Sequence, residues 1–159
     1  MGKNNLYKLK LKALDQIIFE SSLESSFCWF KMGIDFYMSA EILAEAQKSK
    51  GRVTEQQLLL WGYAFENLFK SFWIAKNLNL KSFPKALDSH DLILLRSLVI
   101  QGKSSALERS ILNSLSNFTL WQGRYPIAKS LKGIKFVDIG TVDLKEIKKL
   151  WIKYVNQMP

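Results

Sequence analysis

Two consecutive segments of this chain, residues 26–49 and 54–77, repeat apolar side chains at intervals of three and four residues. That spacing matches the 3.6-residue turn of an α-helix, and each segment is long enough for about six turns. Only a short connection containing Gly51 separates them. Two such helices in succession are expected to pack antiparallel as a hairpin. This hairpin is the predicted centre of the fold.

Capping residues and apolar spacing predict further helices in the rest of the chain. They cover about residues 90–101, about 105–121 and a final segment from about 143, and the predicted caps are Asp88 or Ser89, Ser105 with Glu108, and Thr141 or Asp143. Residues 6–20 are also predicted to be a helix, and the alternation of Lys and Leu over residues 8–12 leaves a strand as the alternative. Residues 134–139 are predicted to be a short extended piece. The sequence therefore predicts an all-α, up-and-down bundle of about five to six helices.

Composition limits the chain to one ordinary globular domain over residues 1–159. Hydrophobic residues make up 48% of it, which excludes intrinsic disorder, and no Pro-, Gly- or Ser-rich linker divides it. The single cysteine, Cys28, excludes an intramolecular disulfide and favours a reducing compartment. The longest apolar stretch, residues 92–100, is interrupted by Arg96 and is too short to span a bilayer. A cytoplasmic protein without membrane contact is expected.

The chain carries 23 Lys and Arg against 14 Asp and Glu, a formal net charge of +9. Lysines gather near the N-terminus and on the last predicted helix, where they are Lys145, Lys148, Lys149 and Lys153. Such clusters attract nucleic acid or another polyanion through long-range electrostatics. A solvated, Lys-rich surface without a partner explains the same composition, and both interpretations stay open.

A polar stripe interrupts the apolar helix predicted over residues 54–77. Tyr63, Glu66, Asn67 and Lys70 fall on one face of it, and Leu59, Trp73 and Ile74 continue that face with apolar groups. Polar groups framed in this way are expected to be partly covered and to need partners. Glu66 and Lys70 can pair with each other at the i,i+4 spacing. The stripe is either an internal structural network or the floor of a pocket.

His90 is the only histidine, and it lies at the predicted start of a helix. Its ring is expected to cap the helix or to bond a carboxylate, and the alternative is a general base with a partner close by. Asp91 lies where a helix dipole favours negative charge. No spacing of His, Cys and carboxylates indicates a metal site, and no cofactor is expected.

Arg124 and Tyr125 lie in a sharp turn between Gly123 and Pro126. An Arg held in such a turn can present its planar guanidinium to one carboxylate or phosphate. Glu66 is the candidate carboxylate, which would make the turn a structural clasp, and an unpaired Arg124 would instead bind an anion. Common nucleotide-binding, hydrolase, protease and nucleic-acid-binding motifs are absent from the sequence.

Three pieces of the chain together resemble the HEPN superfamily of helical bundles. They are Trp61-Gly-Tyr-Ala-Phe-Glu-Asn-Leu-Phe-Lys70, His90-Asp91-Leu92 and Gly123-Arg124-Tyr125-Pro126. The resemblance covers about residues 26–127, which leaves basic extensions at both ends. It implies a bundle that is often dimeric, in a family associated with nucleotide or RNA binding, RNA cleavage, toxin–antitoxin pairs and phage defence. Its ribonuclease members have an Arg that is separated from a following His by four to six residues. Here Lys85 lies at the shortest such spacing from His90, and no Arg lies at any of them.

Three functional hypotheses follow. The first is a HEPN-like homodimer that binds a nucleotide, RNA or an acidic protein through Tyr63, Glu66, Asn67, Lys70, His90, Asp91, Arg124 and Tyr125. The second is a metal-independent ribonuclease toxin in which His90 and Arg124 are the catalytic residues. The third is an interaction module for another protein, which docks on the helix of Lys145–Lys153.

Overall fold

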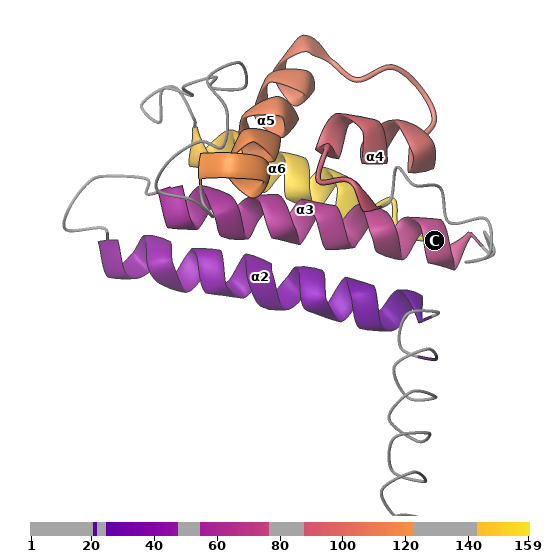
Figure 1. The fold of residues 1–159 in the computed structure, drawn as a ribbon, viewed down its shortest axis with the longest axis horizontal. Coiled ribbons are helices and arrows are strands. Elements are labelled where there is room, and N and C mark those ends of the chain that lie inside the picture. Colours follow the sequence, from indigo (N-terminus) through magenta and orange to yellow (C-terminus); the bar gives the residue numbers. More distant parts are fainter. Residues whose placement is uncertain (1–20, 22–24, 48–54, 77–87, 123–142) are drawn as a thin grey trace, which may run out of the picture.

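The computed structural model describes residues 21, 25–47, 55–76, 88–122 and 143–159. The regular elements are the helices α2 (Ser26–Gln47), α3 (Glu55–Ala75), α4 (Leu92–Val99), α5 (Ala106–Asn117) and α6 (Leu144–Val155), together with η4 (Phe118–Gln122), one π-helical turn that continues α5 (Figure 1). Within these ranges there is no strand, so the predicted all-α bundle is confirmed. The predicted helix over residues 6–20 and the extended piece over residues 134–139 lie outside the described residues.

Helices α2 and α3 form the predicted antiparallel hairpin. The amide of Gln57, near the start of α3, donates to the Ala40 carbonyl on α2 at 3.3 Å. Towards the other end of α3, Lys70 Nζ lies 5.2 Å from the ring centre of Trp29. Gly33 brings the backbones together between these points, because a Cβ there would lie 3.2 Å from the Ala64 carbonyl oxygen. The two ends of the hairpin are thus tied by contacts of different kinds.

Helix α3 is the centre of the bundle and is enclosed by the other helices. All nine residues from Ala64 to Phe72 are buried, which means that every side of the helix is covered. Figure 1 shows α3 between α2 and the group of α4, α5 and α6. The rings of Trp61 and Phe65 pack edge-on against Trp151 of α6, with centroids 6.2 and 5.5 Å apart. The aromatic face predicted for α3 is therefore the core.

The described residues cover only one side of α2, although the helix carries apolar residues on two sides. Trp29, Phe36 and Ala40 turn toward α3 and are buried or half-buried. Phe27 and Met38, in contrast, are exposed to 70% and 50%. Periodicity reports which residues share a face, but it does not report which face is covered within one copy of the chain.

Helix α4 begins later than predicted, because its N-cap is Asp91 and not Asp88 or Ser89. The Asp91 carboxylate accepts hydrogen bonds from the backbone amides of Ile93 and Leu94 at 3.0 and 3.1 Å. The Ser89 hydroxyl does not cap the helix but accepts a hydrogen bond from the Asp91 amide at 3.0 Å. His90 therefore precedes the helix and does not lie in its first turn. The predicted Ser105–Glu108 capping box and the Asp143 cap are confirmed.

A buried cluster around Glu108 ties α4, α5 and α6 together. Glu108 Oε1 accepts hydrogen bonds from the Tyr154 hydroxyl at 2.6 Å and from Lys153 Nζ at 2.9 Å. Its Oε2 accepts the Ser105 amide at 2.9 Å. On the other side of Tyr154, Arg96 Nε donates to the hydroxyl at 3.3 Å. Each helix thus contributes at least one polar group to this cluster.

The Glu108 cluster predicts an acid-sensitive stability. Burial alone raises the pKa of Glu108, but hydrogen bonds from Tyr154, Ser105 and Lys153 outweigh it and lower the pKa to about 2. A lowered pKa stabilises the folded state above the ordinary value of 4.5, and this contribution disappears as the pH falls toward 2. Urea unfolding measured across this range should show stability falling with pH, and Glu108→Gln should flatten that fall. Equal slopes in both proteins would contradict the prediction.

Gly62 sets the distance between α3 and η4. A Cβ at this position would lie 2.4 Å from Thr119 Cγ2 and 3.1 Å from the Leu115 carbonyl oxygen. We predict that Gly62→Ala lowers the free energy of unfolding by about 1–3 kcal/mol, because overpacking outweighs the gain in helix propensity. Urea denaturation followed by circular dichroism measures this. Asn113→Ala, an exposed change on α5, is the matched control and should not lower stability.

Candidate functional site

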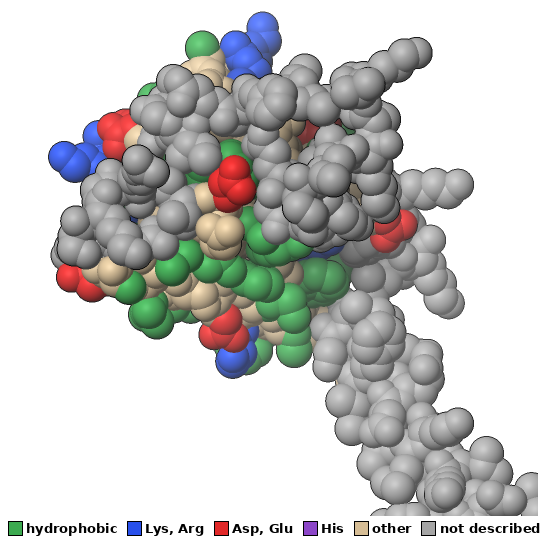
Figure 2. Space-filling model, turned by 60° about the vertical axis from the view of Figure 1, so that its left-hand side comes forward, with side chains coloured by type: hydrophobic (Ala, Val, Ile, Leu, Met, Phe, Trp, Pro, Cys, Tyr) green, Lys and Arg blue, Asp and Glu red, His purple; other side chains and the backbone are tan. Residues whose placement is uncertain are grey.

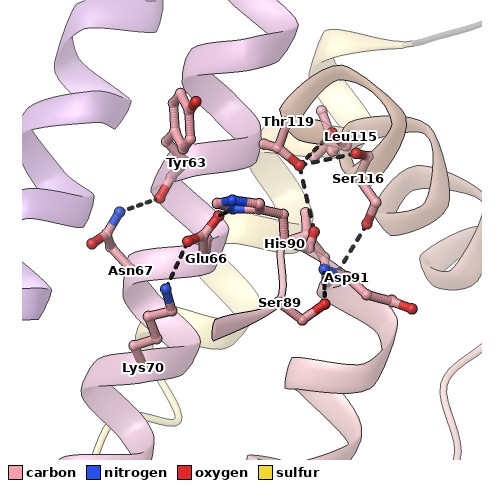
Figure 3. Close-up of polar contacts among 11 residues, drawn as sticks. Tyr63, Glu66, Asn67, Lys70, Ser89, His90, Asp91, Leu115, Ser116 and Thr119 are labelled. Atoms are coloured by element: carbon pink, nitrogen blue, oxygen red, sulfur yellow. Dashed lines mark hydrogen bonds and ion pairs between the residues drawn. The ribbon is translucent and has the colours of Figure 1, made fainter. Parts of the chain in front are cut away.

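The centre of the candidate site is Glu66, a carboxylate on α3 that is only 5% exposed. Its Oε1 accepts a hydrogen bond from Lys70 Nζ at 2.7 Å, one turn along the same helix. Its Oε2 lies 2.7 Å from Nδ1 of His90, which enters from the segment before α4 (Figure 3). A charge taken out of water needs such partners, since an unpaired buried carboxylate is strongly destabilising.

The contact with Glu66 fixes the orientation of the His90 ring and the nitrogen that carries the hydrogen. An ionised carboxylate only accepts hydrogen bonds, so the hydrogen of this contact belongs to Nδ1 of the imidazole. The other ring nitrogen, Nε2, has no hydrogen bond to a described residue, and the side chain is 27% exposed. Nε2 can accept a proton or hydrogen bond when the ring is neutral and can donate one when the ring is charged.

The backbone on either side of His90 is held by polar side chains of α5 and η4. Ser116 Oγ accepts the Leu92 amide at 2.9 Å, and Thr119 Oγ1 lies 3.4 Å from the His90 carbonyl oxygen. The Tyr63 ring meets the imidazole edge-on with centroids 6.5 Å apart. Sequence reasoning missed Ser116 and Thr119. Their spacing of one helical turn on the otherwise apolar side of α5 was the available indication.

Lys70 and Asn67 face α2, on the other side of the stripe. Lys70 Nζ lies over the Trp29 ring as well as beside Glu66, so its charge has an aromatic and an ionic partner. Asn67 donates its side-chain amide to the Tyr63 carbonyl at 2.8 Å. Its Oδ1 is buried and accepts no hydrogen bond from the described residues. The predicted shelter and the predicted Glu66–Lys70 pair are both observed.

The structure assembles part of the predicted set of site residues. Tyr63, Glu66, Lys70 and His90 lie together, as Figure 3 shows. The Asp91 carboxylate belongs to the cap of α4 and points away from Glu66. Arg124 and Tyr125 lie outside the described residues. Both oxygens of Glu66, the carboxylate proposed for Arg124, have partners in Lys70 and His90.

The predicted basic face of α6 is largely balanced by nearby carboxylates. Three of its lysines form ion pairs, Lys148 with Glu41 at 2.6 Å, Lys149 with Glu146 at 2.6 Å and Lys153 with Glu108 at 2.9 Å. Lys145 is in no ion pair with a described residue. Paired lysines attract a polyanion less than unpaired ones, because each already lies beside a negative charge.

The excess positive charge of the protein lies elsewhere. The described residues contain ten Lys and Arg and ten Asp and Glu, so their formal charges cancel. All of the +9 therefore belongs to the remaining segments of the chain. Two of these segments, residues 77–87 and 123–142, together carry six Lys and Arg against one Asp. Residues 77–87 end at the residue before Asp88, close to Ser89 and His90 in the sequence. Residues 123–142 begin directly after η4.

The described part of the chain contains neither a group of metal ligands nor a membrane-spanning helix. No three His, Cys, Asp or Glu side chains there are grouped to hold a metal ion. No helix there is both long and apolar enough to cross a bilayer.

Comparison with protein-family models, with curated protein sequences and with solved structures found no match.

The Glu66 carboxylate is predicted to matter for folding as well as for the site. Glu66→Met keeps the volume but leaves the buried Lys70 ammonium without its ionic partner, and we expect a loss of about 3–5 kcal/mol in the free energy of unfolding. The double variant Glu66→Met/Lys70→Met removes both charges and should lose less than the single one. Urea denaturation compares them. Glu146→Gln breaks an exposed pair and should leave the midpoint nearly unchanged. A single variant as stable as the wild type would contradict the prediction.

Proposed function

We propose that this chain is a HEPN-like binding protein that holds a phosphate-bearing ligand, RNA or a nucleotide, at His90, and that its functional unit is a homodimer. The observation that carries the proposal is the Glu66–His90 contact. A buried carboxylate orients the imidazole from the inside and leaves Nε2 for a ligand on the outside. The partial exposure of the ring means that a ligand can replace water at Nε2 without breaking a contact with a described residue.

The distribution of charge supports a polyanionic ligand. The described residues are formally neutral, and the two segments that adjoin the site in the sequence carry a net charge of +5 out of the total of +9. Residues 77–87 contain two Lys and no Asp or Glu, and residues 123–142 contain Arg124 and three Lys against Asp138. Cations close to the site in the sequence favour an anionic ligand there, because unlike charges attract over long range.

Catalysis of RNA cleavage is the second candidate. A histidine whose Nδ1 is held by a buried carboxylate is the arrangement that orients a general base, with Nε2 as the atom that takes the proton. His90 would then remove the proton of a ribose hydroxyl, and Glu66 would act as the positioning residue. Lys85 in place of the family's Arg counts against this candidate, because a lysine lacks the planar fork of a guanidinium.

Incubation with end-labelled single-stranded RNA tests both candidates on one gel, scored for retention and for cleavage. His90→Ala should weaken retention roughly tenfold or more, the value of a hydrogen bond to a charged group. Retention by the wild type should fall steeply as salt is raised. Ser97→Ala, an exposed change on α4, is the matched control and should bind like the wild type.

Retention that is equal in His90→Ala and wild type would reject the proposed site. Competition by mononucleotides separates the two ligand classes, since a nucleotide site is emptied by them and an RNA site is not. Cleavage that disappears in His90→Ala, and that persists in Ser97→Ala, would favour the second candidate over binding alone.

A further inference from the structure

We infer that the outer face of α2 is the contact surface between two copies of this chain, and that the two α2 helices cross it antiparallel. The inference rests on the homodimer of the proposed function and gives it a location. The outer face consists of Phe27, Lys31, Asp35, Met38 and Ile42, which follow one another at intervals of four, four, three and four residues. They therefore form one stripe along the helix.

The apolar members of the outer face are not covered by the described residues of a single chain. Phe27 is 70% exposed and Ile42 67%, and these are the two highest values among the large hydrophobic side chains of the described residues. Met38 between them is half exposed. Figure 2 shows hydrophobic side chains gathered over α2 along the lower edge of the molecule. Single exposed apolar residues need no explanation, but an ordered row along one helix indicates an interface.

The charges of the outer face of α2 favour a second copy of the chain as its partner. The outer face has one cation and one anion, Lys31 and Asp35, which pair at 2.7 Å with both side chains more than 60% exposed. Helix α2 as a whole carries Lys31 against Asp35, Glu41 and Glu45, in a protein whose net charge is +9. Two copies of a chain with a net charge of +9 repel each other overall, and this repulsion is weaker where a slightly acidic helix meets its own copy.

The order of residues along the stripe is self-complementary. An antiparallel crossing that sets Phe27 against Ile42 of the second copy also sets Lys31 against Met38 of that copy. Asp35 of the second copy then lies one helical turn from Lys31, within reach of its flexible side chain. Because the arrangement is two-fold symmetric, the same contacts occur twice, with apolar pairs at both ends and four compensating charges in the middle.

The contact is also on the side of α2 that faces away from the candidate site. Trp29 and Phe36 of the inner face touch Lys70 and Tyr63, whereas the outer face is turned away from α3. Both sites of a dimer thus stay accessible. A stripe along the 22 residues of α2 is about 33 Å long. At a width of about 10 Å it buries less than the roughly 800 Å² per partner of a standard interface, so the dimer should dissociate on dilution.

Sedimentation velocity on the full chain over a range of concentrations tests the surface. The wild type should shift from monomer to dimer as the concentration rises, and Ile42→Glu should raise the dissociation constant about tenfold or more. Ile152→Glu is the matched control, because it places the same charge at a similarly exposed residue of α6, and it should dimerise like the wild type. Circular dichroism checks that each variant is folded.

Charge exchange tests the register. Lys31→Asp gives the face only acids and Asp35→Lys gives it only lysines, so each variant alone should dimerise more weakly than wild type. An equimolar mixture of the two should form heterodimers at least as tight as the wild-type dimer, because the faces are then complementary.

A wild type that stays monomeric at all concentrations, or a dimer lost in Ile152→Glu and kept in Ile42→Glu, would overturn the inference. So would a mixture of the charge variants that does not associate. RNA retention is measured separately, so a monomer that still retains RNA through His90 would reject the α2 surface and leave the binding site standing.

Discussion

The position of every group in the candidate site depends on one desolvated carboxylate. Glu66 lies inside the bundle, where its charge is tolerated only because Lys70 and His90 approach both oxygens. The contact between Glu66 and His90 fixes the chain just before α4. Ser116 Oγ then accepts a hydrogen bond from the first amide of that helix, that of Leu92. Helix α5 is in this way aligned with α3 through a short series of polar contacts. Apolar side chains, aromatic and aliphatic, make up the core, and the contacts of the carboxylate link three parts of the chain across it.

The sequence was sufficient for the elements and for part of the site. Apolar spacing located α2 and α3 to within about two residues at each described end, and the capping box at Ser105 marked the start of α5. The stripe from Tyr63 to Lys70 was recognised because polar groups break an apolar face. These features are local, since each depends on residues within one or two turns of the same helix.

Three features depended on contacts between distant residues, which no local pattern contains. Asp88, Ser89 and Asp91 are all residue types that commonly cap helices. Asp91 is the N-cap in the structure, and the next amide, that of Leu92, donates to Ser116 Oγ on α5. His90 could have met several carboxylates, and its partner lies 24 residues away on another helix. The two apolar sides of α2 suggested a face for a second copy, but the sequence did not identify Phe27 as part of that face, because a stripe has the same spacing whether a neighbouring helix covers it or not.

The enclosure of α3 has a mechanical consequence for any ligand. A helix whose residues are buried on every side from Ala64 to Phe72 cannot slide or tilt without disturbing all of its neighbours at once. Its amides should open to solvent only in global unfolding. Glu66 is therefore a fixed anchor, and it holds the His90 imidazole in one orientation before any ligand arrives. A ligand would meet a site whose geometry is already set by the core of the bundle.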